Sequence, residues 1–329
     1  LAGTRFIGSL LSWIQQFKKA DRSAAYALLR ERLIYVSAAE MLRLVESFYP
    51  DAVEPELVRR VATRQGRKPY EVRMDPVGRK EVQALRSQTL FLGMSEGARL
   101  DLVRRANVGL LVNEQIIVTA EPDMSRWRSA LGKLKQRSEQ DARFSSIYLI
   151  DDFVASGTTL LRQENGAWDG KLHRFRKVLR EAENALADVG GLLDPDWALH
   201  VHHYVATQPA SSLIQAREAE ARAVLADGWF PKVTFSFGHV LPPSAAVDPS
   251  DPAMAHLVST YYNSDIETAH NTAGGGTSTD IRWGYKNCGL TLVLEHNTPN
   301  NTLPLIWGST DGSNGHPMRP LFRRRQRHS

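Results

Sequence analysis

The stretch that decides the fold reads Ile-Tyr-Leu-Ile-Asp-Asp-Phe-Val-Ala-Ser-Gly-Thr-Thr-Leu-Leu, residues 147–161. Its first residues, 147–150, are apolar and predict a buried strand, which runs directly into two carboxylates, Asp151 and Asp152. A loop of small and hydroxyl residues comes next, and residues 158–161 predict the start of a helix. Ligands of open α/β sheets bind beyond the carboxyl ends of the strands, so this order predicts a binding site.

The loop is suited to a phosphate group. It comprises Ala155, Ser156, Gly157, Thr158 and Thr159. Small side chains let the unpaired N–H groups of a helix N-terminus approach an anion, and the hydroxyls add donors. Carboxylates accept hydrogen bonds, so Asp151 and Asp152 suit the vicinal hydroxyls of a ribose and could hold Mg²⁺ directly or through water. The alternative is a helix N-cap and turn that binds nothing.

Predicted strands and helices alternate after residue 85. Residues 97–107 and 123–137 predict helices. The predicted strands are 89–92, 115–119, 147–150, 199–206, 233–237 and 290–294. This alternation predicts an α/β fold with a mostly parallel, doubly wound sheet.

The N-terminal part predicts helices instead. Apolar residues recur at helical spacing over residues 5–65. Ser23 can cap one of these helices, and Ser37 with Glu40 forms a capping box for another. We therefore expect an N-terminal helical region ahead of the α/β part.

Residues 147–161 resemble the phosphoribosyl pyrophosphate signature of type I phosphoribosyltransferases. The resemblance implies that Asp151 and Asp152 bind the ribose hydroxyls together with Mg²⁺, and that residues 155–159 bind the 5-phosphate. Phe153 departs from the family pattern, in which an aliphatic residue is usual. The expected parts are a helical region, a phosphoribosyltransferase-like α/β domain and a basic tail, over 1–80, 81–310 and 311–329.

A second motif follows the predicted strand 89–92. In the same family a loop at this place binds pyrophosphate, largely through main-chain N–H groups, and the residues that match it are Gly93, Ser95, Glu96, Gly97 and Arg99. The glycines allow close approach of the main chain, and Arg99 could contact phosphate oxygens, although Glu96 is an awkward neighbour for pyrophosphate. The alternative is an ordinary strand-to-helix turn.

The family also places a mobile hood over its ligand, and the matching region here is 119–143. Its Arg and Lys residues could close over pyrophosphate. The alternative is a basic helix whose charged side faces solvent.

Residues 295–301 read Glu-His-Asn-Thr-Pro-Asn-Asn, a polar turn after a predicted strand. With the two earlier motifs, this stretch resembles a divergent branch of phosphoribosyltransferase-like proteins from bacterial conflict systems, some encoded beside retron or other antiviral genes. His296 and Asn297 are candidates for a second-substrate pocket, and a hydrogen-bonded turn is the alternative. They would lie near the ligand if strand 290–294 is central in the sheet.

Composition narrows the classes of function. The chain has 42% hydrophobic and 23% charged residues and a formal net charge of +5, which predicts a globular protein with nucleic acid as a secondary ligand at most. The sequence contains no run of about 18 or more apolar residues, so it predicts no membrane span. Cys288 is the only cysteine, so an internal disulfide and a cysteine-rich zinc site are excluded, and we expect a cytoplasmic protein.

Three further features predict structure rather than chemistry. Residues 274–276 are three glycines in a loop-like stretch, and residues 323–327 form a basic run near the end of the sequence. His200 and His202 share one face of a predicted strand, with no carboxylate at metal-ligand spacing. We expect a connector, a solvated tail and no zinc site.

Two functions from different classes fit these motifs. The first is an enzyme that binds phosphoribosyl pyrophosphate with Mg²⁺ and transfers the phosphoribosyl group to a nitrogen base, another nucleophile or water, as a defence effector. The second is a module that senses a phosphoribosyl ligand or a nucleotide and regulates a protein partner in a defence system. Fold alone does not choose between them.

Overall fold

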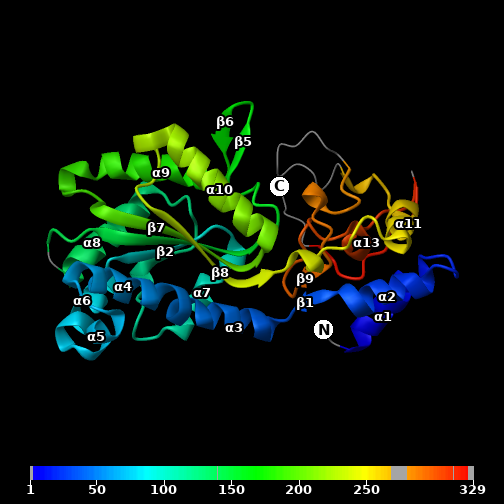
Figure 1. Ribbon diagram of the computed structural model, residues 1–329, viewed down its shortest axis with the longest axis horizontal. Coiled ribbons are helices and arrows are strands. Elements are labelled where there is room, and N and C mark those ends of the chain that lie inside the picture. Colours follow the sequence, from blue (N-terminus) through cyan, green and yellow to red (C-terminus); the bar gives the residue numbers. More distant parts are fainter. Residues whose placement is uncertain (1–2, 139, 268–279, 314, 325–329) are drawn as a thin grey trace. The chain divides into compact units, whose positions relative to one another are not determined.

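The computed structural model, shown in Figure 1, describes residues 3–138, 140–267, 280–313 and 315–324. The chain divides into two compact units. The terminal unit comprises Leu1–Glu40, Thr207–Pro209 and Leu241–Ser329, and the sheet unit comprises Met41–Ala206 and Ala210–Val240. The three glycines at 274–276 and the tail residues 325–329 lie outside the described residues.

The sheet unit is built on a five-stranded sheet in the order β3-β2-β4-β7-β8. Its strands are β2 (Thr89–Gly93), β3 (Ile116–Ile117), β4 (Phe144–Val154), β7 (Leu193–Thr207) and β8 (Val233–Leu241). The pairings of β2 with β3, β2 with β4 and β4 with β7 are parallel. His200 and His202 on β7 bond to Thr234 and Ser236 on β8, so these two strands also run in the same direction. The expected α/β fold with a parallel sheet is confirmed.

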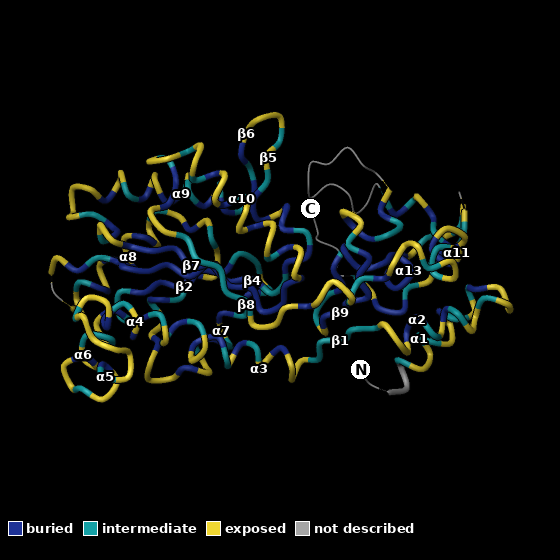
Figure 2. The backbone as a smooth tube through the Cα atoms, in the orientation of Figure 1, coloured by how far each residue is buried: buried dark blue, intermediate teal, exposed yellow. Residues whose placement is uncertain are grey.

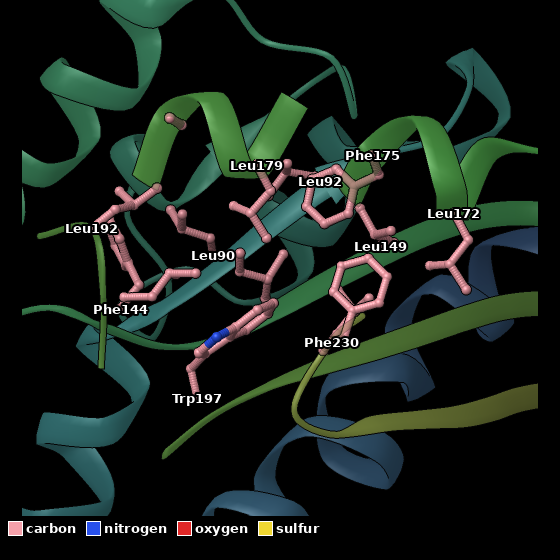
Figure 3. Packing of buried hydrophobic residues seen from close by; sticks show 14 of the residues in the cluster. Leu90, Leu92, Phe144, Leu149, Leu172, Phe175, Leu179, Leu192, Trp197 and Phe230 are labelled. Atoms are coloured by element: carbon pink, nitrogen blue, oxygen red, sulfur yellow. The ribbon is translucent and has the colours of Figure 1, made fainter. Parts of the chain in front are cut away.

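One face of the sheet carries the main hydrophobic core. Leu90, Leu92, Leu149 and other apolar strand residues alternate along β2, β4 and β7. They pack against α8 (Met124–Arg137), α9 (Lys171–Ala185) and α10 (Gln208–Leu225), as Figure 3 shows for Phe175 and Leu179 of α9. Each fully buried side chain of this kind contributes about 1.5–3 kcal/mol.

The other face of the sheet is contacted by helices that precede β2 in the sequence, beginning with α3. Phe48, in α3 (Ala38–Phe48), has its ring centroid 6.2 Å from that of Phe91, 5.6 Å from that of Tyr148 and 4.5 Å from that of His202. Further α-helices described in this unit are α4 (Glu54–Gln65), α5 (Pro69–Met74), α6 (Pro76–Ser87) and α7 (Leu100–Ala106). Figure 2 shows β2, β4 and β7 buried between the two layers.

Two capping predictions had different outcomes. The capping box of α3 is confirmed, because Glu40 accepts from the Ser37 N–H at 2.8 Å and its own N–H donates to Ser37 Oγ at 3.2 Å. The predicted cap at Ser23 is wrong. Helix α2 (Arg22–Arg32) begins before Ser23, and Asp21 occupies its N-cap position.

The terminal unit has its own small core. The parallel strands β1 (Ile34–Val36) and β9 (Leu292–Leu294) pair with each other in a separate two-stranded sheet. The indole N–H of Trp13 in α1 (Gly3–Gln15) donates to the Leu305 carbonyl at 2.6 Å. Further helices that the structure describes in the terminal unit include α2, α11 (Pro252–Tyr261) and α13 (Pro304–Trp307). The strand expected at 290–294 therefore exists, but it is not central in the main sheet.

The expected division of the chain into domains at residues 80 and 310 stays a prediction. Contacts place the helices up to residue 87 in both units, with α1 and α2 in the terminal unit and α4 to α6 in the sheet unit. None of the helices in the described parts of the chain is both long and apolar enough to span a membrane.

Candidate functional site

The candidate site lies where the order of the sheet reverses. From β2 the chain crosses to β3 on one side, and from β4 it crosses to β7 on the other. Such a switch point is where open α/β sheets bind their ligands. Gly93 at the end of β2 pairs with Ile150 of β4, and the Met94 N–H donates to the Ile150 carbonyl at 2.8 Å. The two motifs predicted from the sequence therefore meet at one edge of the sheet.

The loop that follows β4 is a tight turn. The N–H groups of Leu160 and Leu161 both donate to the Gly157 carbonyl at 3.2 Å. Gly157 has φ +70°, and a Cβ there would lie 2.6 Å from Cγ2 of Ile214, so only glycine fits without strain. Main-chain N–H groups beside such a left-handed residue point into a common concavity that favours anions.

The main-chain donors of this loop are open. Within the described residues, the N–H groups of Ser156, Gly157, Thr158 and Thr159 donate to no protein acceptor. The hydroxyls of Ser156 and Thr158 lie 2.9 Å apart and bond to each other. Buried N–H groups without a partner are rare in folded proteins, so a loop with several open donors is suited to an anion.

The helix expected to start at 158–161 is absent at that place. The chain instead forms a hairpin of β5 (Arg162–Glu164) and β6 (Ala167–Asp169). Asn165 and Gly166 at its tip both have positive φ, which is the turn that Asn-Gly favours. The next helix, α9, begins at Lys171, so no helix N-terminus follows the loop directly. This Asn-Gly pair is the sequence signal that would have predicted the hairpin.

Asp151 is buried, with 4% of its surface exposed. Ser95 Oγ donates to its Oδ1, and the Lys171 ammonium lies 2.5 Å from its Oδ2. Burial alone would raise the pKa of Asp151, but Lys171, with help from Ser95, holds it below the usual value. The carboxylate of Asp151 is therefore ionised, and the ammonium of Lys171 balances its charge inside the protein.

Asp152 points to the opposite face of the sheet, because consecutive strand residues alternate. It is half-buried and lies against the upstream loop. A Cβ on Gly97 would lie 2.3 Å from Asp152 Oδ2, so Gly97 makes the space that this carboxylate occupies. The Tyr204 hydroxyl donates to the Ala98 carbonyl at 2.8 Å and so ties the upstream loop to β7.

The upstream loop differs from the ordinary strand-to-helix turn that was the alternative to a pyrophosphate loop. Ser95 caps a single 3₁₀ turn (Glu96–Ala98) by accepting from the Gly97 N–H at 3.1 Å. Arg99 then adopts φ 47°, and α7 starts only at Leu100, so the helix predicted over 97–107 is interrupted. A non-glycine residue at positive φ is strained, and such strain concentrates at functional sites.

The glycine that begins this motif has a structural role. Gly93 is buried, and a Cβ there would lie 3.1 Å from the Val118 carbonyl and 3.2 Å from Ala98 Cβ. Its small size therefore serves packing between the strand and the loop. Whether the loop binds pyrophosphate stays a prediction.

Residues 119–143 contain an ordinary covering helix. Trp127, Leu131 and Leu134 of α8 are buried in the core. Most of the basic residues of the helix are exposed, and Lys135 Nζ bonds to the Val189 carbonyl at 2.7 Å. This arrangement favours the solvent-facing helix over the hood.

His296 and Asn297 lie in the terminal unit, next to β9. Together with Tyr35 and Phe322 they line a cavity of about 380 Å³. The Leu294 and Asn297 main chains exchange hydrogen bonds at 3.0 Å, as the turn alternative required. Their role as a second-substrate pocket stays a prediction.

Cysteine and histidine chemistry finds no support here. Burial raises the pKa of the Cys288 thiol, which makes it a poor nucleophile. Burial also lowers the pKa of His200 and His202 to about 3, so both are neutral. Among the described residues no group of three His, Cys, Asp or Glu side chains could hold a metal ion.

The structure adds two residues that sequence reasoning missed. Lys171 pairs with Asp151 across 20 positions of sequence. His203 stands opposite Asp151 on β7 and is fully buried, and burial lowers its pKa to about 4. A lysine as the first residue of a helix is the one sequence signal that could have drawn attention to Lys171, because the helix dipole disfavours a cation there.

Comparison with known proteins gives one result. A family model described as PRTase-CE matches residues 10–324. The searches of curated proteins and of solved structures returned no match.

Proposed function

Since the chain belongs to the PRTase-CE family of phosphoribosyltransferase-like proteins, we propose that it binds phosphoribosyl pyrophosphate and transfers or hydrolyses its phosphoribosyl group. The observation that carries this proposal is the row of open N–H groups from Ser156 to Thr159 at the switch point of the sheet. A phosphate monoester supplies the acceptors that these donors lack. The half-buried carboxylate of Asp152 lies at the same edge and suits a ribose hydroxyl.

The proposed chemistry needs no protein nucleophile. Cleavage at the anomeric carbon passes through a transition state that resembles an oxocarbenium ion, with negative charge growing on the departing pyrophosphate. Positioning of the sugar by the 155–159 loop and charge stabilisation at the site are then the contributions of the protein. The strained loop around Arg99 is the proposed pyrophosphate side.

Magnesium remains part of the proposal, but the two aspartates do not fit it equally. Both carboxylate oxygens of Asp151 already bind protein donors, from Ser95 and Lys171. Asp152 is the more exposed of the two. Mg²⁺ prefers to keep several waters and to share substrate phosphates with one or two carboxylates. Asp152 is therefore the residue that would hold an ion arriving with pyrophosphate.

The wider role that we propose is that of a bacterial defence effector acting on nucleotides or on a protein partner. It rests on the resemblance of the three motifs to conflict-system proteins. A second function, sensing without catalysis, is favoured by one observation: Asp151 is buried and already neutralised by Lys171. In that case the ligand would bind and report its presence to a partner.

The test measures binding and turnover in the full chain. Phosphoribosyl pyrophosphate with Mg²⁺ is titrated by calorimetry, and pyrophosphate release is followed in parallel. Release that disappears in the double variant Asp151→Asn/Asp152→Asn supports the enzyme, and binding without release supports the sensor. Absence of both binding and release in the folded wild-type chain overturns the proposed function.

A further inference from the structure

Lys171 occupies a position that helix physics disfavours. It is the first residue of the 15-residue helix α9, where the helix dipole creates a positive potential. Its side chain is only 20% exposed, so the ammonium has also lost much of its hydration. A residue placed against both local preferences is expected where function demands it.

The contacts of Lys171 explain what holds it there. Its ammonium pairs with Oδ2 of Asp151, whose other oxygen accepts from Ser95. Breaking such a buried pair leaves an uncompensated charge, which is strongly destabilising. Asp151 therefore has its balancing cation in the protein itself, and both of its oxygens already accept from protein donors.

Lys171 also has donors to spare beside the phosphate loop. An ammonium carries three N–H donors. In the described residues, the only acceptor of Lys171 Nζ is Asp151. The Lys171 main-chain N–H donates to the Thr159 carbonyl at 3.0 Å, which ties the lysine to the end of the loop.

From this arrangement we propose that Lys171 is a built-in cation of the ligand site. It neutralises Asp151 and offers its remaining donors to the phosphate oxygens of a 5-phosphorylated sugar. Binding of the phosphate end then requires no metal ion at Asp151. This inference rests on the proposed function and adds to it the residue that balances the charge of Asp151 in place of a metal ion.

The experiment separates the phosphate end of the ligand from its pyrophosphate. Ribose 5-phosphate, which has no pyrophosphate to carry Mg²⁺, is titrated by calorimetry into the full chain in EDTA and again in Mg²⁺. Lys171→Met is compared with wild type and with Lys177→Met, which removes the same charge from an exposed position of the same helix. Loss of a charged hydrogen bond predicts about 10- to 100-fold weaker binding for Lys171→Met in EDTA.

A second variant guards against misfolding. Lys171→Met leaves Asp151 without its partner, so the double variant Lys171→Met/Asp151→Asn, which removes both charges, is measured beside it. Circular dichroism and thermal unfolding verify the fold of each variant. We expect the double variant to fold and to bind ribose 5-phosphate in EDTA as weakly as Lys171→Met.

The outcomes distinguish this inference from the proposed function. Equal affinity of wild type, Lys171→Met and Lys177→Met in EDTA overturns the role of Lys171. Wild-type binding that appears only with Mg²⁺ also overturns it, while the phosphoribosyl site stands. Failure of the wild type to bind either ribose 5-phosphate or phosphoribosyl pyrophosphate, with or without Mg²⁺, overturns the proposed function itself.

Discussion

Gly157 offers the sharpest test of the phosphate loop, through the variant Gly157→Ala. A non-glycine residue at φ +70° costs about 1–2 kcal/mol. The added Cβ would also lie 2.6 Å from Cγ2 of Ile214, and overpacking of this kind costs about 1–3 kcal/mol. We therefore expect the free energy of unfolding to fall by about 2–5 kcal/mol in total, and ribose 5-phosphate to bind more weakly.

The chain contains a matched control for this variant. Gly166, at the tip of the hairpin, has φ +78°, and no heavy atom lies within 4 Å of the place that an alanine methyl group would take. Gly166→Ala therefore bears only the conformational cost of about 1–2 kcal/mol. Urea denaturation measures stability, and calorimetry with ribose 5-phosphate measures binding.

A double-mutant cycle with Ile214→Ala isolates the steric part. Ile214→Ala removes the atom that the new methyl group would meet, so the cost of Gly157→Ala should shrink in that background. The reasoning is refuted if Gly157→Ala and Gly166→Ala lower stability equally and bind ribose 5-phosphate with wild-type affinity.

Three further outcomes follow from the same geometry. Gly97→Ala should displace the Asp152 carboxylate, which lies 2.3 Å from the new Cβ, and so weaken phosphoribosyl pyrophosphate binding in calorimetry while circular dichroism stays unchanged. Asp151→Asn should lower the free energy of unfolding by about 3 kcal/mol at pH 7, because Lys171 loses its charged partner. The pKa of Asp151 is lowered in the folded protein, so its stabilising contribution is present above the unfolded pKa and is lost as the pH falls through the folded pKa. The difference in unfolding free energy between the variant and the wild type should therefore shrink in urea titrations at acid pH. His202 has a folded pKa of about 3 against 6.5 unfolded, so it favours unfolding as pH drops below 6.5; His202→Gln should remove about 1.4 kcal/mol per pH unit from that slope, and an unchanged slope would contradict this.

The sequence was informative about the sheet because apolar runs are local signals. The predicted strands at 89–92, 147–150 and 199–206 lie inside β2, β4 and β7. β4 and β7 are longer than the apolar runs, since pairing with neighbours extends a strand beyond them. The predicted strand at 290–294 lies outside the main sheet, which the sequence does not reveal because strand partners depend on contacts distant in sequence.

The sequence located the candidate loop but not the arrangement of the residues around it. The order of carboxylates and small residues located the loop, yet it did not reveal that Asp151 and Asp152 extend the strand and face opposite sides of the sheet. The pair of Lys171 with Asp151 depends on the hairpin that carries the chain away and back. Such a contact leaves no periodic trace in the sequence.

The hairpin of β5 and β6 has a practical consequence for following this protein at work. Its base is closed, because the Leu172 N–H donates to the Leu160 carbonyl at 3.0 Å and Gly170 packs against the same carbonyl. Its tip, at Asn165 and Gly166, is exposed. A fluorescent label at the tip would be separated from the phosphate loop only by the short strands of the hairpin. Its emission could report ligand binding without altering a residue of the site.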